Sequence, residues 1–222
     1  MEKYIIKYGE ESLEESRIDS ENNYYMKKIF NHVQTFRDLQ DCYIAYLEGR
    51  IGSNPSYGGP VNPETIALLK KLIRVNDNGF VSITGQPGNC IKKGDQYSLQ
   101  RTHIEGFMQK SHQNSFIRYM KSYSHYYCEV RDAKNKLFDT FPPGPVYLNR
   151  YISENKEVGH SYDIKVGMDS NLSLFSIFSE FSNISNVLQT DSISVIIVAR
   201  EFNSGSVEDL LLRYFNEIHF HQ

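Results

Sequence analysis

The residues best suited to chemistry begin at the end of a predicted strand. Residues 80–84 place Val81 and Ile83 on one face of a β-strand, and the turn Gly85-Gln86-Pro87-Gly88 follows directly. Ligands collect where loops leave the ends of strands. The glycine N–H groups in this turn can approach an anion closely, and the Gln86 amide offers both a donor and an acceptor. A plain connecting turn explains the same four residues.

Three versatile side chains, Arg101, His103 and Glu105, follow at alternating positions. Residues 100–108 are predicted to form a strand, because Gly106 interrupts the segment and Thr, Ile and Phe favour extended structure. On a strand the three side chains share one face, where they offer a cation, a proton-transfer group and a carboxylate. This set suits binding and acid–base catalysis on a phosphate or carboxylate substrate. Two alternatives are a helix that pairs Arg101 with Glu105, and an exposed sheet face with a solvated Arg–Glu pair.

Several short motifs of residues 36–107 occur together in a fixed order. They are Leu47-Glu48-Gly49, Tyr57-Gly58-Gly59-Pro60, Pro63-Glu64-Thr65, Thr84-Gly85-Gln86-Pro87-Gly88 and Gln100-Arg101-Thr102-His103-Ile104-Glu105-Gly106-Phe107. In this order and spacing the segment resembles an uncharacterised bacterial domain family with a Ser-Gln-Pro-Gly turn followed by Gln-Arg-x-x-x-Glu-Gly-Phe.

The resemblance implies that one group of residues lies close together in the folded protein. It does not imply a reaction. The members of this group would be Gln86, Pro87, Gly88, Gln100, Arg101, Glu105 and Gly106. Gly85 stands where the family has serine, so the resemblance implies no catalytic serine in this chain. His103 lies outside the shared pattern.

Other reactive side chains are sparse. Cys90 follows the Gln-Pro-Gly turn and could act as a nucleophile with His103 or His112 as its base, although a plain thiol is the simpler interpretation. His219 and His221 alternate at the C-terminus, but two imidazoles without a further ligand make a weak metal site. We therefore expect neither a metal nor a cofactor. The glycine-rich residues 49–60 lack the order of a phosphate-binding P-loop and are expected to be a connecting loop.

Composition excludes some functions. The chain has 222 residues with 24 Lys+Arg against 27 Asp+Glu, a balance that argues against bulk nucleic-acid binding. Residues 10–21 hold six of the acidic residues and one Arg, which leaves 23 basic against 21 acidic residues elsewhere. An anionic ligand is therefore more plausible than the net charge of -3 suggests. Three scattered cysteines and the lack of a long apolar run favour a cytoplasmic protein without a membrane segment.

Periodicity outlines one folded unit. Residues 1–23 are expected to be a flexible N-terminal segment and residues 24–222 a single globular domain. Helices are predicted over residues 36–48, 62–76, 111–123, 172–181 and 207–218, and strands over 80–84, 100–108, 126–131, 137–140 and 193–199. Residues 85–98 are predicted to be a loop, and 153–170 are not assigned. The fold class is α/β or α+β, with a single mixed β-sheet covered by helices.

These observations favour a binding protein for a small phosphorylated or nucleotide-like molecule, which could also be a hydrolase or transferase. Gln86, Gly88, Gln100 and Arg101 would bind the ligand, and Glu105 and Arg101 would be the catalytic pair. The rival hypothesis is a non-catalytic interaction or inhibitor protein that uses a tyrosine-rich surface, since the chain contains 16 Tyr.

Overall fold

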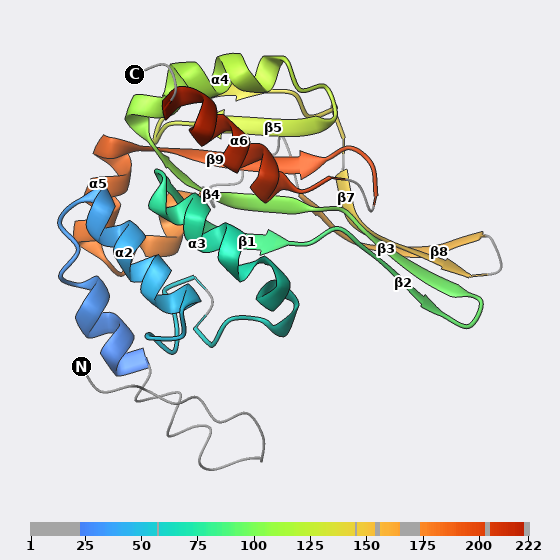
Figure 1. The fold of residues 1–222 in the computed structure, drawn as a ribbon, viewed down its shortest axis with the longest axis horizontal. Helices are drawn as coiled ribbons and strands as arrows, with labels where there is room; N and C mark the ends of the chain where they lie inside the picture. The colour runs from blue at the N-terminus through green and yellow to red at the C-terminus, as the bar shows by residue number, and fades with distance from the viewer. Residues whose placement is uncertain are drawn as a thin grey trace, which may run out of the picture.

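Two antiparallel sheets form the framework of the protein (Figure 1). This computed structural model describes residues 23–56, 58–144, 146–153, 156–164, 174–202 and 205–219. The first sheet has the order β1-β4-β9-β5-β6, built from β1 (Phe80–Gln86), β4 (His103–Gln109), β9 (Ser192–Ala199), β5 (Tyr126–Arg131) and β6 (Lys136–Asp139). The second has the order β2-β3-β7-β8, built from β2 (Asn89–Lys93), β3 (Gln96–Gln100), β7 (Val146–Ser153) and β8 (Lys156–Ile164).

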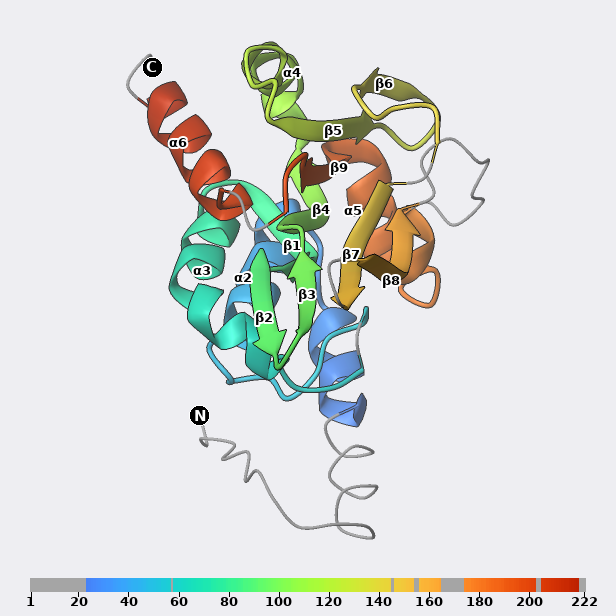
Figure 2. The same cartoon turned by 90° about the vertical axis from the view of Figure 1, so that its right-hand side faces the viewer.

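Helices cover the first sheet. They are α2 (Phe36–Leu47), η1 (Pro63–Leu68), α3 (Leu69–Asp77), η2 (Lys110–His112), α4 (Gln113–Lys121), η3 (Leu174–Phe178), α5 (Ser182–Asp191) and α6 (Val207–His219), and residues 23–30 are also helical. Figure 2 shows α3 and α6 on one side of the central strands and α5 on the other. Among the described residues, no helix is long and apolar enough to cross a bilayer.

The prediction of a single mixed sheet is wrong. The predicted loop 85–98 contains the β2/β3 hairpin, which pairs with the β7/β8 hairpin to form the second sheet. Both hairpins project from the helix-covered body (Figure 1). Gly94 turns the first hairpin at φ 62°. Strands β2 and β3 are exposed or only partly buried and lack the apolar alternation that identifies a half-buried strand from sequence, while β7 buries Val146 and Leu148 at its start.

The centre of the first sheet follows the predictions more closely. The apolar run 193–199 forms β9, which is buried almost throughout and pairs with both β4 and β5. The predicted strand 100–108 corresponds to β4, which begins at His103; Gln100 instead ends β3, and Arg101 and Thr102 connect the two strands. On one face of β4 the Phe107 ring packs against the rings of Phe175 and Phe178, with centroid distances of 5.1 and 6.0 Å. This strand therefore lies inside the core.

The predicted helices differ mainly at their ends. Helix α2 begins as predicted, with a capping box in which Thr35 Oγ1 accepts from the Asp38 N–H at 3.1 Å and Asp38 Oδ2 accepts from the Thr35 N–H at 2.9 Å. The predicted helix 62–76 divides into η1 and α3. The predicted helix 172–181 is reduced to the short η3, and α5 was not predicted. Of the segment 1–23, predicted to be flexible, residues 1–22 lie outside the described residues and residue 23 begins a helical stretch.

A buried asparagine fixes α3 to the first strand. Asn76 is fully buried, and its Nδ2 donates to the Leu72 carbonyl and to Ser82 Oγ, both at 2.8 Å. Its Oδ1 accepts from the Ser82 N–H at 3.1 Å. Because β1 is the edge of its sheet, this side chain satisfies a backbone donor that no strand pairs with. Helices α2 and α3 lie beside this edge strand.

Gly106 sets how closely β1 can approach β4. A Cβ at this position would lie 2.6 Å from Phe80 Cε1 and would also collide with the Val81 carbonyl oxygen. We expect Gly106→Ala to lower the free energy of unfolding by about 3 kcal/mol, because the two strands must separate to admit a methyl group. Urea denaturation measures this change. Gly59→Ala is the control, since no atom lies within 4 Å of its added Cβ. Equal losses in both variants would contradict this account of the β1–β4 contact.

Candidate functional site

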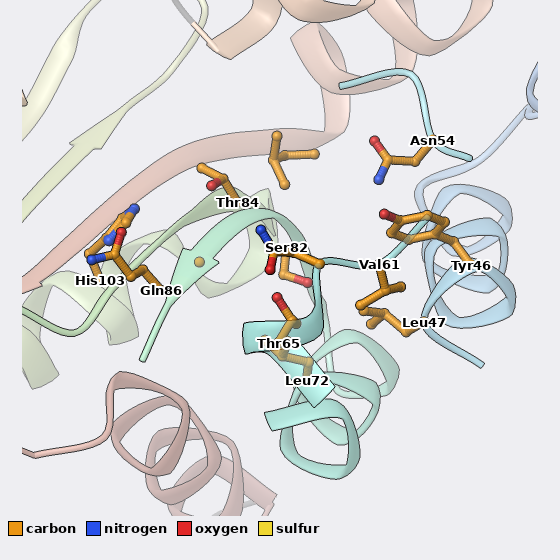
Figure 3. A pocket seen from close by; sticks show the side chains of 13 residues that line it. Tyr46, Leu47, Asn54, Val61, Thr65, Leu72, Ser82, Thr84, Gln86 and His103 are labelled. Atoms are coloured by element: carbon orange, nitrogen blue, oxygen red, sulfur yellow. The ribbon is translucent and has the colours of Figure 1, made fainter. Parts of the chain in front are cut away.

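A cavity of about 120 Å³ lies along the edge of β1 (Figure 3). Strand β1 contributes its residues 82–86, β4 contributes His103, and α2, the loop before η1, η1 and α3 form the remaining walls. The lining residues are Tyr46, Leu47, Asn54, Val61, Asn62, Thr65, Leu72, Ser82, Ile83, Thr84, Gly85, Gln86 and His103. The volume exceeds by several-fold the roughly 30 Å³ that one water occupies in the liquid. It is therefore large enough for an organic group.

The lining combines apolar surface with neutral polar groups. Three side-chain amides, three aliphatic hydroxyls, one phenol and one imidazole belong to the lining residues, and none of these residues is Lys, Arg, Asp or Glu. Amides and hydroxyls can donate and accept hydrogen bonds without a net charge. The arrangement therefore suits a neutral ligand with its own donors and acceptors.

The glycine-rich loop 49–60 connects α2 to η1 and also forms one wall of the cavity. The Tyr46 hydroxyl donates to the Gly59 carbonyl at 3.1 Å, and the Ser56 hydroxyl and N–H donate to Asn54 Oδ1 at 2.6 and 2.8 Å. Asn54 is only 2% exposed. Tyr46, Asn54 and Thr65 are not recognisable as lining residues from the sequence, because nothing in the local pattern indicates that this loop folds back against β1.

His103 is the buried end of the cavity. It is 5% exposed, and its Nδ1 has no hydrogen-bond partner among the described residues. Burial lowers the pKa of its imidazole from 6.5 to about 4. The ring is therefore neutral at pH 7, and its Nδ1 is buried and unpaired within the described part of the chain.

Glu105 lies on the same face of β4, opposite Thr84 on β1 and Ile196 on β9. It does not line the cavity. Burial raises the pKa of this carboxyl from 4.5 to about 7, so it carries a proton for part of the time at neutral pH. The predicted catalytic role of Glu105 remains a prediction.

Arg101 lies before β4 and reaches away from the cavity. Its Nε donates to the Tyr147 carbonyl at 2.9 Å and its Nη1 to the Ala199 carbonyl at 3.0 Å. Ala199 ends β9, which borders β4 on the side opposite β1. The structure therefore brings His103 and Glu105 together on one strand face, and it directs the Arg101 guanidinium to the β9 side.

The other predicted ligand-binding residues meet where the two sheets join. Gln86 lines the cavity, and its Nε2 donates to Asn149 Oδ1 at 2.9 Å. Gln100 pairs with Asn149 across β3 and β7. Gly88 packs on the next segment, since a Cβ there would lie 3.3 Å from the Thr102 nitrogen. Of these three, Gln86 alone belongs to the cavity lining.

The remaining candidates do not form a reactive group. Cys90 is exposed on β2, and no hydrogen bond joins it to His103 or His112 within the described part of the chain. His112 instead packs against Tyr214 and Phe215. In the described ranges no three His, Cys, Asp or Glu side chains are grouped to hold a metal ion. His221 lies outside the described residues.

His103 should remain uncharged over the physiological range. We expect the imidazole resonances of His103 in NMR spectra to show no titration between pH 5.5 and 8, because burial disfavours the charged ring. A histidine in an unstructured peptide, with a pKa of about 6.5, titrates within the same window and provides the reference. A titration midpoint near 6.5 for His103 would contradict its position in the core.

Glu105 should make stability depend on pH. Its pKa is about 7 in the folded state against 4.5 when exposed, so its stabilising contribution is complete below pH 4.5 and is lost as pH rises through 7. Relative to Glu105→Gln, the wild type should lose up to about 3 kcal/mol of unfolding free energy between pH 5 and 8. Urea denaturation at both pH values measures the difference. Glu217→Gln, at an exposed position of α6, is the control. A pH-independent difference between wild type and Glu105→Gln would contradict the burial of this carboxyl.

Comparisons with known proteins agree with an uncharacterised family. Residues 26–126, a little under half of the chain, match the model of a domain of unknown function (DUF6919). A probable methylenetetrahydrofolate reductase (NADH) of Oryza sativa subsp. japonica is 24% identical over 132 residues, which is 59% of this chain and 20% of the rice protein. Methylenetetrahydrofolate reductase (NADH) 1 of Arabidopsis thaliana is 25% identical over 120 residues, 49% of this chain and 20% of the plant protein. The chain thus spans about a fifth of the length of these relatives, and its residues 26–126 are similar to an uncharacterised domain family.

Proposed function

We propose that this protein binds an uncharged, polar small molecule in the cavity beside β1. The observation that carries the proposal is the lining, in which neutral amides, hydroxyls and an imidazole are combined with apolar side chains. Ligand sites are typically concave and mainly apolar, with a few polar groups that orient the ligand. Of the predicted ligand classes, the cavity favours the nucleoside-like part over a phosphorylated one.

The lack of charged side chains in the lining supports an uncharged ligand over a phosphorylated one. A phosphate placed in the cavity would leave water without meeting a cation, which is unfavourable. Neutral His103 supplies no positive charge there at pH 7. A nucleoside offers ring nitrogens and hydroxyls without a charge, and these match the amides of Asn54, Asn62 and Gln86.

The relatives suggest which molecules to test. Their names mention methylenetetrahydrofolate and NADH. We propose that a molecule of either kind is a candidate ligand only if an uncharged portion of it enters the cavity. The hydrolase or transferase activity predicted from the sequence, with Glu105 and Arg101 as its catalytic pair, remains a further hypothesis. It would require these two side chains to act on one substrate from different sides of β4.

A second candidate function is binding of another protein through the projecting sheet. Ile91, Tyr151 and Val158 on this sheet are 44%, 41% and 65% exposed. The predicted tyrosine-rich surface has less support, because Tyr43, Tyr46, Tyr126 and Tyr214 are buried in the core. The exposed apolar side chains of the projecting sheet therefore favour this alternative more than the tyrosines do.

Thermal-shift assays and calorimetric titrations test ligand binding in the cavity. Adenosine, adenosine monophosphate, NADH and a tetrahydrofolate are the probes. Adenosine should raise the melting temperature and bind more tightly to the cavity than its monophosphate. The double variant Thr65→Val/Thr84→Val keeps the shape of both lining side chains and removes two hydroxyls, so its affinity should fall by about tenfold.

The matched control is Thr190→Val, an exposed position on α5 far from the lining. It removes a hydroxyl of the same kind and should leave adenosine binding unchanged. If adenosine does not stabilise the wild type, or if it binds the double variant equally well, the proposed nucleoside-like ligand is wrong. Binding of a different uncharged probe that the double variant weakens would retain the cavity and change only the ligand.

A further inference from the structure

A second group of side chains, separate from the cavity, alternates arginine with aromatic rings. The Arg101 guanidinium carbon lies 4.1 Å from the centroid of the Phe202 ring, and that of Arg150 lies 5.0 Å from the same centroid. The Arg200 guanidinium carbon lies 4.6 Å from the Tyr127 ring centroid. The Tyr127 hydroxyl also influences Arg101 electrostatically. Arg101 and Arg150 thus share the Phe202 ring, and Arg200 lies on the ring of Tyr127, the residue whose charge also acts on Arg101. We call these three arginines the arginine cluster.

Two members of the arginine cluster have no acidic partner. Within the described part of the chain, neither Arg101 nor Arg200 forms an ion pair with a carboxylate. Arg101 is also partly buried, and desolvation is the largest cause of the lowered pKa of its guanidinium. A cation that is partly removed from water and lacks a counter-charge is unfavourable unless an anion binds beside it.

Nearby acidic groups offset only part of this charge. Glu157 pairs with Arg150 at 3.1 Å and approaches His160 Nδ1 at 3.8 Å. Glu201 raises the pKa of Arg101 electrostatically, as the fourth-ranked cause of its shift. The protein therefore holds three arginines against two carboxylates here. All three arginine side chains remain partly exposed, so a ligand can reach them.

We propose that the arginine cluster binds the phosphate group of a small molecule, at a site distinct from the cavity. Guanidinium groups form paired, charge-assisted hydrogen bonds to phosphate oxygens, and several of them can share a dianion. The aromatic rings and the carbonyls of Tyr147 and Ala199 hold the arginines in place, which limits the entropy lost on binding. The partner chemistry is phosphate, carried by either a nucleotide or a sugar.

Pyrophosphate titration tests this site directly. Calorimetry with the full chain should show saturable binding that sodium chloride weakens and that acetate at equal concentration does not displace. Arg200→Gln and Arg150→Gln should each weaken pyrophosphate binding by at least about tenfold. These two positions are preferred over Arg101, whose hydrogen bonds to two backbone carbonyls also join the sheets. Competition by adenosine monophosphate and by glucose 6-phosphate then separates the two sources of phosphate.

Arg213→Gln is the matched control. Arg213 also lies over a tyrosine ring, 5.8 Å from the centroid of Tyr123, but on α6 and outside the arginine cluster. Its substitution should leave pyrophosphate affinity unchanged. The proposal is overturned if the folded wild type shows no saturable binding at millimolar pyrophosphate, or if both cluster variants bind as well as the wild type. Neither result affects the test with adenosine.

Discussion

The pairing of β4 with strands on both of its sides is the constraint that organises this protein. Register with β1 aligns His103 with Gln86, and register with β9 aligns it with Val198. Gly106 lets the rings and carbonyls of β1 approach closely. Because hydrogen bonds fix these positions, groups that reach toward β1 and groups that reach toward β9 end on different sides of one strand. The cavity and the arginine cluster therefore lie on different sides of β4.

The two sides differ in charge. On the β1 side, burial keeps His103 neutral beside amides and hydroxyls, and the edge of β1 is closed by α2, α3 and the glycine-rich loop. On the β9 side, Arg101 and Arg200 lie against aromatic rings without an ion-pair partner among the described residues. A ligand with a neutral ring and a ligand with a phosphate would thus use different surfaces. Ligand binding in the cavity and phosphate binding at the arginine cluster can therefore be tested independently.

Sequence reasoning identified the strands of the core because their patterns are local. The apolar run of β9, the capping box of Thr35 and the strand that holds Glu105 are each encoded within a few residues. The β2/β3 hairpin is not evident from the sequence because its strands are exposed or only partly buried, and β7 is not because Val146 and Leu148 are its only buried residues. The cavity and the arginine cluster were missed because they join distant segments: Tyr46 to Gln86 in one case, and Arg101 to Phe202 in the other. Spacing in a single chain does not reveal such contacts.

The separation of the two sites by β4 is the central claim, and backbone amide NMR tests it most directly. Amide spectra of the ¹⁵N-labelled chain would be recorded during a pyrophosphate titration. Shifts are predicted at residues 147–150 and 199–202, around the arginine cluster, with residues 82–85 of β1 unchanged; Gln86 is left out because it donates to Asn149. Shifts at residues 82–85 comparable to those at 199–202 would contradict the separation, because one ligand would then occupy both sides of the strand.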